Sequence, residues 1–313
     1  MKIAITGSTG CIGRETVVEA LRQGHDVIAL TRSDDVSFET RSSRLEIRVC
    51  NLNDETAVRK ALKDCDCVIH LAADLKSRQQ RSNTIDMTKN LLEAIEHENI
   101  RQLVLCSSIS VLNYSNEAAM STIDESTGRC ENDALLGQYA AMKCEQERMA
   151  ESWFVNHNSL TIIRPGLVYN ETDLSGAHAG FFKSGFGIAA MHDGQVPLVY
   201  LESVARACIE ACNKSTNSGL SVYHLTDNCL PRQKNYLKAL KSAKVIRAYV
   251  PLPWKLYGLG AQIIRIVFES IGIRSRLPDA FCKNSVAARC KPFLFSNTKS
   301  CDALDWAPRQ TQL

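Results

Sequence analysis

The chain has 313 residues, 45% hydrophobic and 23% charged, which is ordinary for a globular protein and long enough for a core domain with a second lobe. Its formal net charge is only +3, and no cluster of Lys and Arg is interleaved with aromatic residues, so nucleic acid is disfavoured as a partner. The sequence has 13 cysteines, but it shows no secretion signal and no pair of zinc-knuckle spacings. We therefore expect free thiols in a cytoplasmic protein without a metal site.

The first 14 residues, MKIAITGSTGCIGR, predict a strand, a glycine turn and a helix in succession. The apolar run at residues 2–6 is typical of a buried parallel strand, and the helix begins near Arg14. Between them, Gly7 permits a tight turn, Gly10 lets the backbone approach a pyrophosphate, and Gly13 lets the helix pack on the strand. The free N–H groups of a helix N-terminus bind anions. The alternative is an ordinary strand-to-helix turn, but we predict a dinucleotide cradle made of Gly7, Ser8, Thr9, Gly10, Cys11, Ile12 and Gly13.

Further apolar runs predict strands at residues 25–31, 45–49, 67–71, 102–106 and 160–164, with helices at 55–62, 83–98 and 138–150. Strands that alternate with helices form β-α-β units, whose strands run parallel. A further strand at 221–226 and a helix at 232–243 follow. The fold class that we predict is α/β, a doubly wound parallel Rossmann sheet with a smaller, mostly C-terminal substrate lobe.

The end of the second predicted strand indicates the cofactor. In a dinucleotide fold an acidic residue at this point hydrogen-bonds the adenosine ribose and excludes a 2′-phosphate, whereas a basic residue accepts that phosphate. This chain has Arg32 there, and its acidic residues Asp34 and Asp35 come later. We therefore predict NADP(H) in preference to NAD(H). The alternative is that Arg32 is only a solvated loop charge.

Tyr139 and Lys143 lie four residues apart in the helix predicted at 138–150, hence on one face and about one turn apart. An unperturbed tyrosine has a pKa near 10 and is a poor acid or base at neutral pH. A neighbouring ammonium stabilises the phenolate, so we expect Lys143 to lower the pKa of Tyr139. Tyr139 then exchanges a proton with a substrate oxygen. The same spacing also occurs by chance in surface helices, which is the alternative.

Together these features resemble the extended short-chain dehydrogenase/reductase family, which includes sugar-nucleotide epimerases and dehydratases, 3β-hydroxysteroid dehydrogenases and dihydroflavonol reductases. The resemblance rests on TGSTGCIG, on the serines after the strand at 102–106, on the tyrosine and lysine, and on RPGLVY at 164–169. It implies that Ser108, with Ser107 or Ser110 as alternates, orients the substrate oxygen. It also implies that Tyr139 is the proton donor or acceptor and that Lys143 holds the nicotinamide ribose, so both contact the cofactor.

The resemblance implies further cofactor contacts at Asn51, Leu52, Leu71, Ala72, Ala73, Pro165, Gly166 and Val168. Two positions depart from the family pattern, because Asn51 stands where many members have Asp and Thr84 where the family usually has Asn. His70 ends the fourth predicted strand and has no second histidine at ligand spacing, so we interpret it as structural. The family's common homodimer packs through the helix that carries Tyr139, and the resemblance implies the same arrangement here.

The resemblance also divides the chain. Residues 1–170 form a Rossmann domain to which 196–228 return, and residues 171–195 and 229–313 form a substrate-binding lobe. Sugar-nucleotide enzymes usually carry an Arg for the substrate diphosphate near the returning segment, but this chain reads QVPLVY at 195–200. A missing cation loses charge-assisted hydrogen bonds. We therefore predict an NAD(P)-dependent oxidoreductase that exchanges a hydride with a hydroxyl or keto group of a bulky small molecule.

Two alternatives to this function stay open. A nucleotide-sugar epimerase or dehydratase would take its diphosphate contacts from Arg274, Arg276 or Arg289. A non-catalytic dinucleotide-binding protein is disfavoured, because the expected serine, tyrosine and lysine are all present.

The stretch at 249–273, YVPLPWKLYGLGAQIIRIVFESIGI, is dominated by apolar residues. Lys255, Arg265 and Glu269 interrupt it, so no run reaches the ~18 uncharged residues that a membrane-spanning helix needs. We interpret the stretch as a helix in the core of the second lobe. The alternatives are a surface that lies on a membrane, on a dimer partner or on an apolar substrate.

Overall fold

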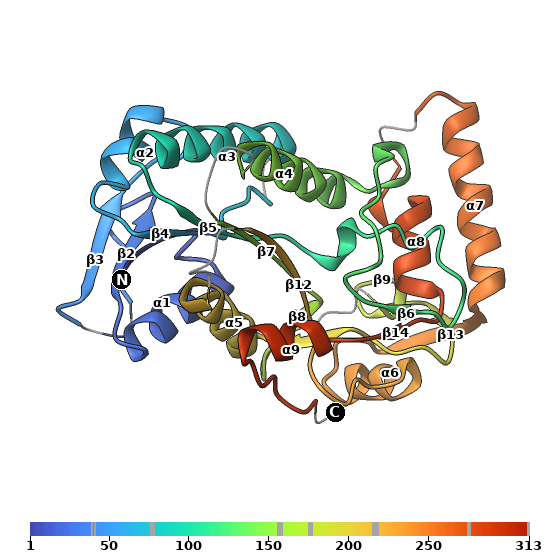
Figure 1. Ribbon diagram of the computed structural model, residues 1–313. Coiled ribbons are helices and arrows are strands. Elements are labelled where there is room, and N and C mark those ends of the chain that lie inside the picture. Colours follow the sequence, from blue (N-terminus) through green and yellow to red (C-terminus); the bar gives the residue numbers. More distant parts are fainter. Residues whose placement is uncertain are drawn as a thin grey trace.

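The computed structural model describes residues 1–38, 40, 42–75, 79–154, 159–174, 178–214, 219–273 and 277–311. Within these residues, seven parallel strands form one sheet in the order β12-β7-β5-β4-β1-β2-β3 (Figure 1). They are β1 (Lys2–Thr6), β2 (Asp26–Thr31), β3 (Leu45–Val49), β4 (Cys67–His70), β5 (Gln102–Cys106), β7 (Ser159–Pro165) and β12 (Gly219–Leu225). The predicted doubly wound Rossmann sheet is confirmed, and every predicted strand end lies within two residues of the observed one.

The order of the strands locates the ligand crevice. After β1 the chain moves outward through β2 and β3 and then returns to place β4 on the other side of β1. The connections therefore leave β1 in opposite directions, and open α/β sheets bind ligands at such a switch point, beyond the carboxyl ends of the strands. The loops that follow β1 and β4 lie at this edge.

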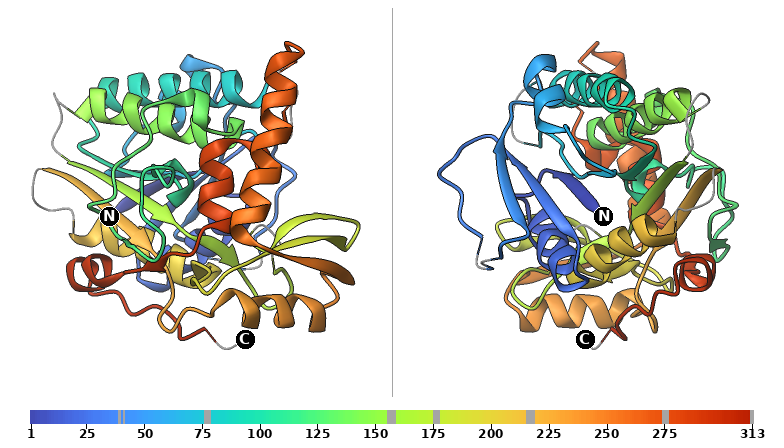
Figure 2. Two further views of the ribbon diagram at one scale, coloured as in Figure 1. Left: turned by 90° about the vertical axis from the view of Figure 1, so that its right-hand side faces the viewer. Right: turned by 60° about the vertical axis from the view of Figure 1, so that its left-hand side comes forward.

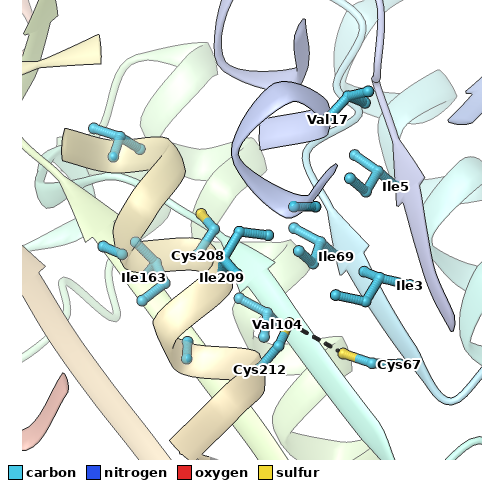
Figure 3. Packing of buried hydrophobic residues seen from close by; sticks show 14 of the residues in the cluster. Ile3, Ile5, Val17, Cys67, Ile69, Val104, Ile163, Cys208, Ile209 and Cys212 are labelled. Carbon is cyan, nitrogen blue, oxygen red and sulfur yellow. Dashed lines mark hydrogen bonds between the residues drawn. The ribbon is translucent and has the colours of Figure 1, made fainter. Parts of the chain in front are cut away.

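Helices cover both faces of the sheet (Figures 1 and 2). α1 (Cys11–Arg22), α5 (Leu201–Lys214) and α9 (Thr298–Leu304) lie on one face, and α2 (Glu55–Ala61), α3 (Gln80–His97) and α4 (Gln138–Phe154) on the other. Figure 3 shows the first of these interfaces, where Ile3, Ile5 and Ile69 of the sheet share one buried cluster with Val17 and Ile209. Full burial of such a side chain contributes about 1.5–3 kcal/mol, so this layer is a main source of stability.

The second lobe is built on a smaller sheet of β9 (Gly180–Lys183), β10 (Phe186–Met191) and β13 (Ala248–Pro253). α6 (Gln233–Ser242) packs with one face of it, because Tyr236 and Leu240 share a buried cluster with Ala189. On the other face, Ala190 shares a cluster with residues of α7 (Trp254–Ser270) and α8 (Lys283–Cys290). Two pairs of short strands bring distant segments together, β6 (Thr122–Ile123) with β14 (Leu294–Phe295) and β8 (Leu167–Tyr169) with β11 (Leu198–Tyr200).

The last helix, α9, packs with the Rossmann sheet. Leu304 and Trp306 are buried in the same cluster as Ile209. The Nε1 of Trp306 donates a hydrogen bond to the carbonyl oxygen of Ser203 at 2.8 Å. The end of the predicted lobe of residues 229–313 thus contacts the Rossmann sheet, and the division of the chain stays a prediction.

The apolar stretch at 249–273 does not form the buried core helix that we predicted. In α7 only Tyr257 and Ala261 are buried. The prediction was wrong because α7 packs through one narrow face, and large apolar side chains on the rest of the helix are exposed, namely Leu256, Leu259, Ile263, Ile266 and Val267. Among the described residues, no helix is long and apolar enough to cross a membrane.

Candidate active site

The loop after β1 has the close contacts of a phosphate cradle. Gly7 adopts a φ of 65°, a left-handed conformation that favours glycine. The N–H of Gly10 donates to the carbonyl oxygen of Gly7 at 2.9 Å, which closes the turn. A Cβ on Gly13 would lie 2.1 Å from the same oxygen, so only glycine lets α1 start this close to β1. Gly10 caps α1 without a side-chain hydrogen bond, which leaves the first N–H groups of the helix to an anion.

The loop after β4 lies against this turn. A Cβ on Gly7 would lie 2.9 Å from the nitrogen of Ala72, so the two loops are in close contact. Thr6 ties them together, because its Oγ1 accepts hydrogen bonds from the N–H groups of Leu71 and Ala72, both at 3.2 Å. Leu71, Ala72 and Ala73 are half-buried. The structure thus brings the predicted contacts at 71–73 to the same crevice as the glycine turn.

His70 belongs to a buried chain of hydrogen bonds beside these loops. Its Nδ1 lies 2.7 Å from the Thr6 Oγ1, and because that oxygen already accepts two N–H groups, Thr6 donates the proton of this contact. The His70 Nε2 lies 3.2 Å from Thr88 Oγ1, to which the Gln146 Nε2 also donates at 2.8 Å. Burial, with a smaller effect of the Lys143 charge, lowers the pKa of His70 to about 3. Neutral His70 therefore links the glycine turn to α4, which is the structural role that we predicted.

The remaining residues of the predicted cradle are of two kinds. Ser8 is fully buried, and its Oγ donates to the carbonyl oxygen of Leu30 at 2.7 Å, so Ser8 holds the loop to β2. Ile12 is half-buried on α1. The residues at the crest of the loop are exposed and accessible to a ligand, namely Thr9, Gly10 and Cys11.

Arg32 and Asn51 follow the carboxyl ends of β2 and β3, and both are exposed. No ion-pair partner of Arg32 occurs in the part of the chain that the structure describes. The Asn51 Oδ1 already accepts a hydrogen bond from the N–H of Asn53 at 3.1 Å. The Leu52 side chain is buried, and its carbonyl oxygen accepts from the Asn90 Nδ2 at 2.9 Å, so Leu52 supports the loop through its side chain.

Three further predicted contacts, Pro165, Gly166 and Val168, lie where the chain leaves β7. A Cβ on Gly166 would lie 2.1 Å from the carbonyl oxygen of Pro197, and its N–H donates to the carbonyl oxygen of Leu225 at 2.9 Å. Pro165 is buried and Val168 half-buried. Because β7 is the neighbour of β5, these residues lie next to the strand end that carries the candidate serines.

α4 carries the candidate lysine in a buried position. Only 5% of the surface of Lys143 is exposed, and its Nζ donates to the carbonyl oxygen of Cys106 at 2.8 Å. Burial lowers the pKa of Lys143, and the charges of Cys106 and Glu147 oppose that effect. Glu147, one turn further along α4, is itself fully buried and accepts two hydrogen bonds from Arg164, at 2.9 and 2.7 Å. The ammonium is thus fixed at the end of β5, next to a buried ion pair.

Tyr139 stands in the first turn of α4, and 37% of its surface is exposed. Its hydroxyl lies near the side chain of Ser108, which favours the phenolate. Burial of the hydroxyl raises the pKa of Tyr139 to about 12, with a further contribution from Cys106, and the Ser108 side chain acts in the opposite direction. The predicted lowering of this pKa by Lys143 is therefore wrong for this structure. The reason is that desolvation dominates, while the ammonium is held by the Cys106 carbonyl group.

The serines after β5 have different partners. Ser108 caps the short helix η1 (Ile109–Val111), where its Oγ accepts from the N–H of Ser110 at 3.2 Å. It is the serine that the structure brings to Tyr139. The hydroxyls of Ser107 and Ser110 are buried and have no hydrogen-bond partner among the described residues. An unpaired buried hydroxyl costs about 1–3 kcal/mol of folding free energy, and a ligand that hydrogen-bonds to it would remove this cost. Ser107 directly follows Cys106, whose carbonyl group binds Lys143, so its hydroxyl is suited to bind a ligand near that lysine.

These observations fit the predicted dinucleotide. The cradle at 7–13 presents backbone N–H groups where a side chain would collide, Arg32 offers an exposed cation, and Ser107 offers a buried hydroxyl near the reactive end. In the described ranges, no group of three or more His, Cys, Asp and Glu side chains is arranged to hold a metal ion.

Some contacts of the site could not be predicted from the sequence. Asp279, in the short helix η4 (Asp279–Phe281), accepts a hydrogen bond from the N–H of Tyr139 at 3.3 Å. The second lobe therefore holds the first turn of α4, although the two residues are 140 positions apart. Thr84, which replaces the family's usual Asn, accepts a hydrogen bond from the N–H of Asp74 at 2.8 Å. It thereby fixes the loop after β4.

A cavity of about 290 Å³ adjoins the site where the lobe meets the segment before α4. Its walls include Leu136, Gln138, Arg265 and Asp279. Gln138 directly precedes Tyr139, but the walls do not include the catalytic candidates themselves. The cavity is therefore a neighbour of the reacting atoms and not their immediate surroundings. The sequence predicted Arg274, Arg276 or Arg289 as ligands of a substrate diphosphate. Arg289 is not among the residues that line this cavity. Arg274 and Arg276 lie outside the described residues.

The site combines a glycine cradle at the switch point of a Rossmann sheet with a helix that presents Tyr139 beside Ser108 and Lys143 one turn further along. This combination defines the extended short-chain dehydrogenase/reductase class. Within that class, the NAD dependent epimerase/dehydratase family matches residues 3–220. The chain belongs to this family.

Known proteins have similar sequences or folds. The chain is 26% identical over 180 residues to the sterol-4-alpha-carboxylate 3-dehydrogenase, decarboxylating, of Dictyostelium discoideum, which covers 55% of this chain and 54% of that protein. It is 33% identical over 108 residues to an uncharacterised protein of Mycobacterium tuberculosis, and this alignment covers 34% of this chain and 12% of that protein. The alignments thus span about half or less of these relatives. The fold matches that of UDP-glucose 4-epimerase from Bifidobacterium longum in complex with NAD+ and UDP, with a TM-score of 0.71 and 16% identity over 99% of this chain and 94% of that one.

Proposed function

We propose that the protein is an NAD(P)-dependent oxidoreductase, which exchanges a hydride between nicotinamide and a hydroxyl or keto group of a bulky small molecule. The observation that carries the proposal is that Tyr139 lies near Ser108, one helical turn from the buried Lys143. Membership of the NAD dependent epimerase/dehydratase family supports it. The name of the Dictyostelium relative, a dehydrogenase, supports it as well.

Each of the three side chains has its own role in this proposal. Tyr139 gives its proton to the keto oxygen during reduction and takes a proton from the hydroxyl during oxidation. Ser108, which lies near the Tyr139 hydroxyl, holds the same substrate oxygen in place. Lys143 holds the ribose of the cofactor with its fixed ammonium. The bound nicotinamide supplies or takes the hydride, and the positive charge of its oxidised form favours the phenolate of Tyr139.

The surroundings of the returning segment favour an oxidoreductase over a sugar-nucleotide enzyme. Gln195 stands close to the position where sugar-nucleotide enzymes usually carry an arginine. The Oε1 of Gln195 already accepts a hydrogen bond from the N–H of Phe295 at 2.8 Å. Gln195 therefore joins the returning segment to β14 instead of facing a diphosphate. A nucleotide-sugar epimerase or dehydratase is the second candidate. The description of the family and the fold of the Bifidobacterium enzyme favour it.

Turnover assays separate these functions. We expect the purified protein to consume NADPH with one or more bulky ketones, for which steroid and aromatic ketones are the first choice. Interconversion of UDP-sugars without net consumption of nicotinamide would establish the second candidate instead. A protein that binds dinucleotide but converts neither class of compound would contradict both, and would indicate the non-catalytic alternative.

The cofactor preference in our proposal is NADP(H) over NAD(H), and it rests on Arg32. A hydrogen bond between charged groups contributes about 1.5–3 kcal/mol, so Arg32→Asp should weaken NADPH binding by at least about tenfold. The affinity for NADH should not fall. Fluorescence titration with both dinucleotides measures the change, and Lys60→Asp, the same charge change at an exposed position on α2, is the control. Unchanged NADPH affinity in Arg32→Asp would mean that Arg32 is only a loop charge.

The high pKa of Tyr139 predicts a different pH dependence for each direction of the reaction. With a pKa of about 12, Tyr139 is protonated at neutral pH, so reduction, which needs the phenol, should keep a constant rate from about pH 7 to about pH 10. Oxidation needs the phenolate, whose population rises about tenfold for each pH unit below the pKa. The oxidation rate should therefore rise across the same range. A level profile for oxidation would show that the bound ligands bring the pKa of Tyr139 down to neutrality.

A further inference from the structure

One surface of the second lobe has no part in the proposed reaction and exposes many apolar side chains. Those on α7 recur every three or four residues, so they share one face of the helix. They are Leu256, Leu259, Ile263, Ile266 and Val267, followed by Ile271 directly after the helix. A Cβ added to Gly260, on the same face, would meet no atom within 4 Å, so no described element packs there. The left view of Figure 2 shows α7 and α8 side by side at the outside of the molecule.

The exposed apolar surface continues onto the sheet of the lobe. Ile188 on β10 pairs with Phe181 on β9 and with Val250 on β13, and paired residues share one face of a sheet. The inner end of this face, at Ala190, is covered by α7, while its outer end is open. We call the six side chains of the α7 surface together with Phe181, Phe186, Ile188 and Val250 the apolar face. Its ten residues are each between 40% and 64% exposed. A monomeric protein rarely exposes so many contiguous apolar side chains without a partner.

Cations border the apolar face. Lys183 and Arg247 are exposed at the hairpin end of the sheet, where the N–H of Arg247 donates to the carbonyl oxygen of Gly185 at 2.7 Å. Lys255 is exposed in the first turn of α7. Over residues 229–273 the sequence has eight Lys and Arg and one acidic residue, Glu269, although the whole chain has a net charge of only +3. Positive charge is therefore concentrated in the lobe that carries the apolar face.

We propose that the apolar face binds the surface of an anionic lipid bilayer. The aliphatic side chains of α7 enter the boundary between headgroups and acyl chains, and the bordering Lys and Arg residues contact anionic headgroups. A second copy of the chain is a poorer partner. A two-fold interface places one patch against its own copy, so Lys183, Arg247 and Lys255 would meet equal charges. Anionic lipid complements both the apolar and the cationic part of this surface.

The test is sedimentation of the full chain with vesicles of phosphatidylcholine that contain phosphatidylserine, compared with vesicles of phosphatidylcholine alone. We expect binding to the anionic vesicles that weakens as salt is added. Ile263→Glu should lower the vesicle partition coefficient by at least about tenfold, because it places a charge where an aliphatic side chain is buried in lipid. Gln262→Glu adds the same charge at the neighbouring exposed position, which lies outside the apolar face. This control should lower the vesicle partition coefficient by less than about fivefold.

Each other outcome would overturn the proposal. One such outcome is the absence of binding to anionic vesicles, and another is an equal effect of Ile263→Glu and Gln262→Glu on the partition coefficient. The third is that the protein forms a dimer in solution without lipid and that Ile263→Glu converts this dimer to monomers. The last result would assign the apolar face to a second copy of the chain. Both substituted residues are exposed, so thermal unfolding should show that the two variants fold as the parent does. The vesicle measurement does not depend on catalysis, so its failure would leave the proposed oxidoreductase function unaffected.

Discussion

Replacing Tyr139 with phenylalanine is expected to lower kcat by roughly 10²- to 10⁴-fold, the usual contribution of a positioned acid or base. The substitution removes the hydroxyl near Ser108 and leaves the ring in place. Affinity for the dinucleotide should stay nearly constant, because the glycine turn and Lys143 are untouched. Steady-state kinetics with the best ketone of the panel, together with a fluorescence titration of NADPH, measure both quantities.

Tyr223→Phe is the matched control for this experiment. It removes the same hydroxyl from a half-buried tyrosine on β12, whose ring lies 5.6 Å from the Lys299 ammonium and outside the site. Its kcat should be that of the parent. If Tyr139→Phe kept full turnover on a genuine substrate, the proposed role of Tyr139 would be lost, and another acid near Ser108 would have to supply the proton.

The second large effect is expected on stability, at Glu147. This fully buried carboxylate accepts hydrogen bonds from Arg164 at 2.9 and 2.7 Å and from Arg129 at 3.2 Å. Glu147→Ala leaves Arg164 buried with an uncompensated charge, which typically costs about 3–5 kcal/mol. The midpoint of unfolding in urea should fall accordingly. Turnover should fall too, because Glu147 helps to keep Lys143 charged on the same helix.

Glu145→Ala provides the comparison on the same helix. Glu145 pairs with Arg148 at 3.0 Å, but the two side chains are 33% and 28% exposed, so this ion pair contributes about 0–1 kcal/mol. The urea midpoint of Glu145→Ala should therefore stay close to that of the parent. Equal losses in the two variants would mean that the buried ion pair has no special role in stability.

The features that the sequence predicted correctly are those set by local patterns. The glycine spacing after β1 requires the tight turn that places Gly13 against Gly7, and the apolar runs define strands whose ends differ by at most two residues from the prediction. The choice of Ser108 among three serines agrees with its place near the Tyr139 hydroxyl. The roles of these residues in catalysis and cofactor binding stay predictions.

The features that the sequence did not predict depend on packing between distant segments. The pKa of Tyr139 is set by burial and by the carbonyl group that holds Lys143, and neither follows from the spacing of a tyrosine and a lysine. The contact between Asp279 and the first turn of α4 joins residues 140 positions apart. The exposure of α7 could not be inferred either, because an apolar helix looks the same in sequence whether or not another element covers it.

The packing of α5 and α9 beneath the sheet has a consequence for how the protein is made. Ile3, Ile5 and Ile69 are synthesised early, but residues that cover them, such as Ile209 and Leu304, come from α5 and α9. Domains generally fold as units during synthesis, the N-terminal part first. Here α1 covers only part of one face of the nascent Rossmann sheet, and the rest stays uncovered until α5 and then α9 have left the ribosome. Chaperones that shield apolar surfaces are therefore expected to bind the growing chain for most of its translation.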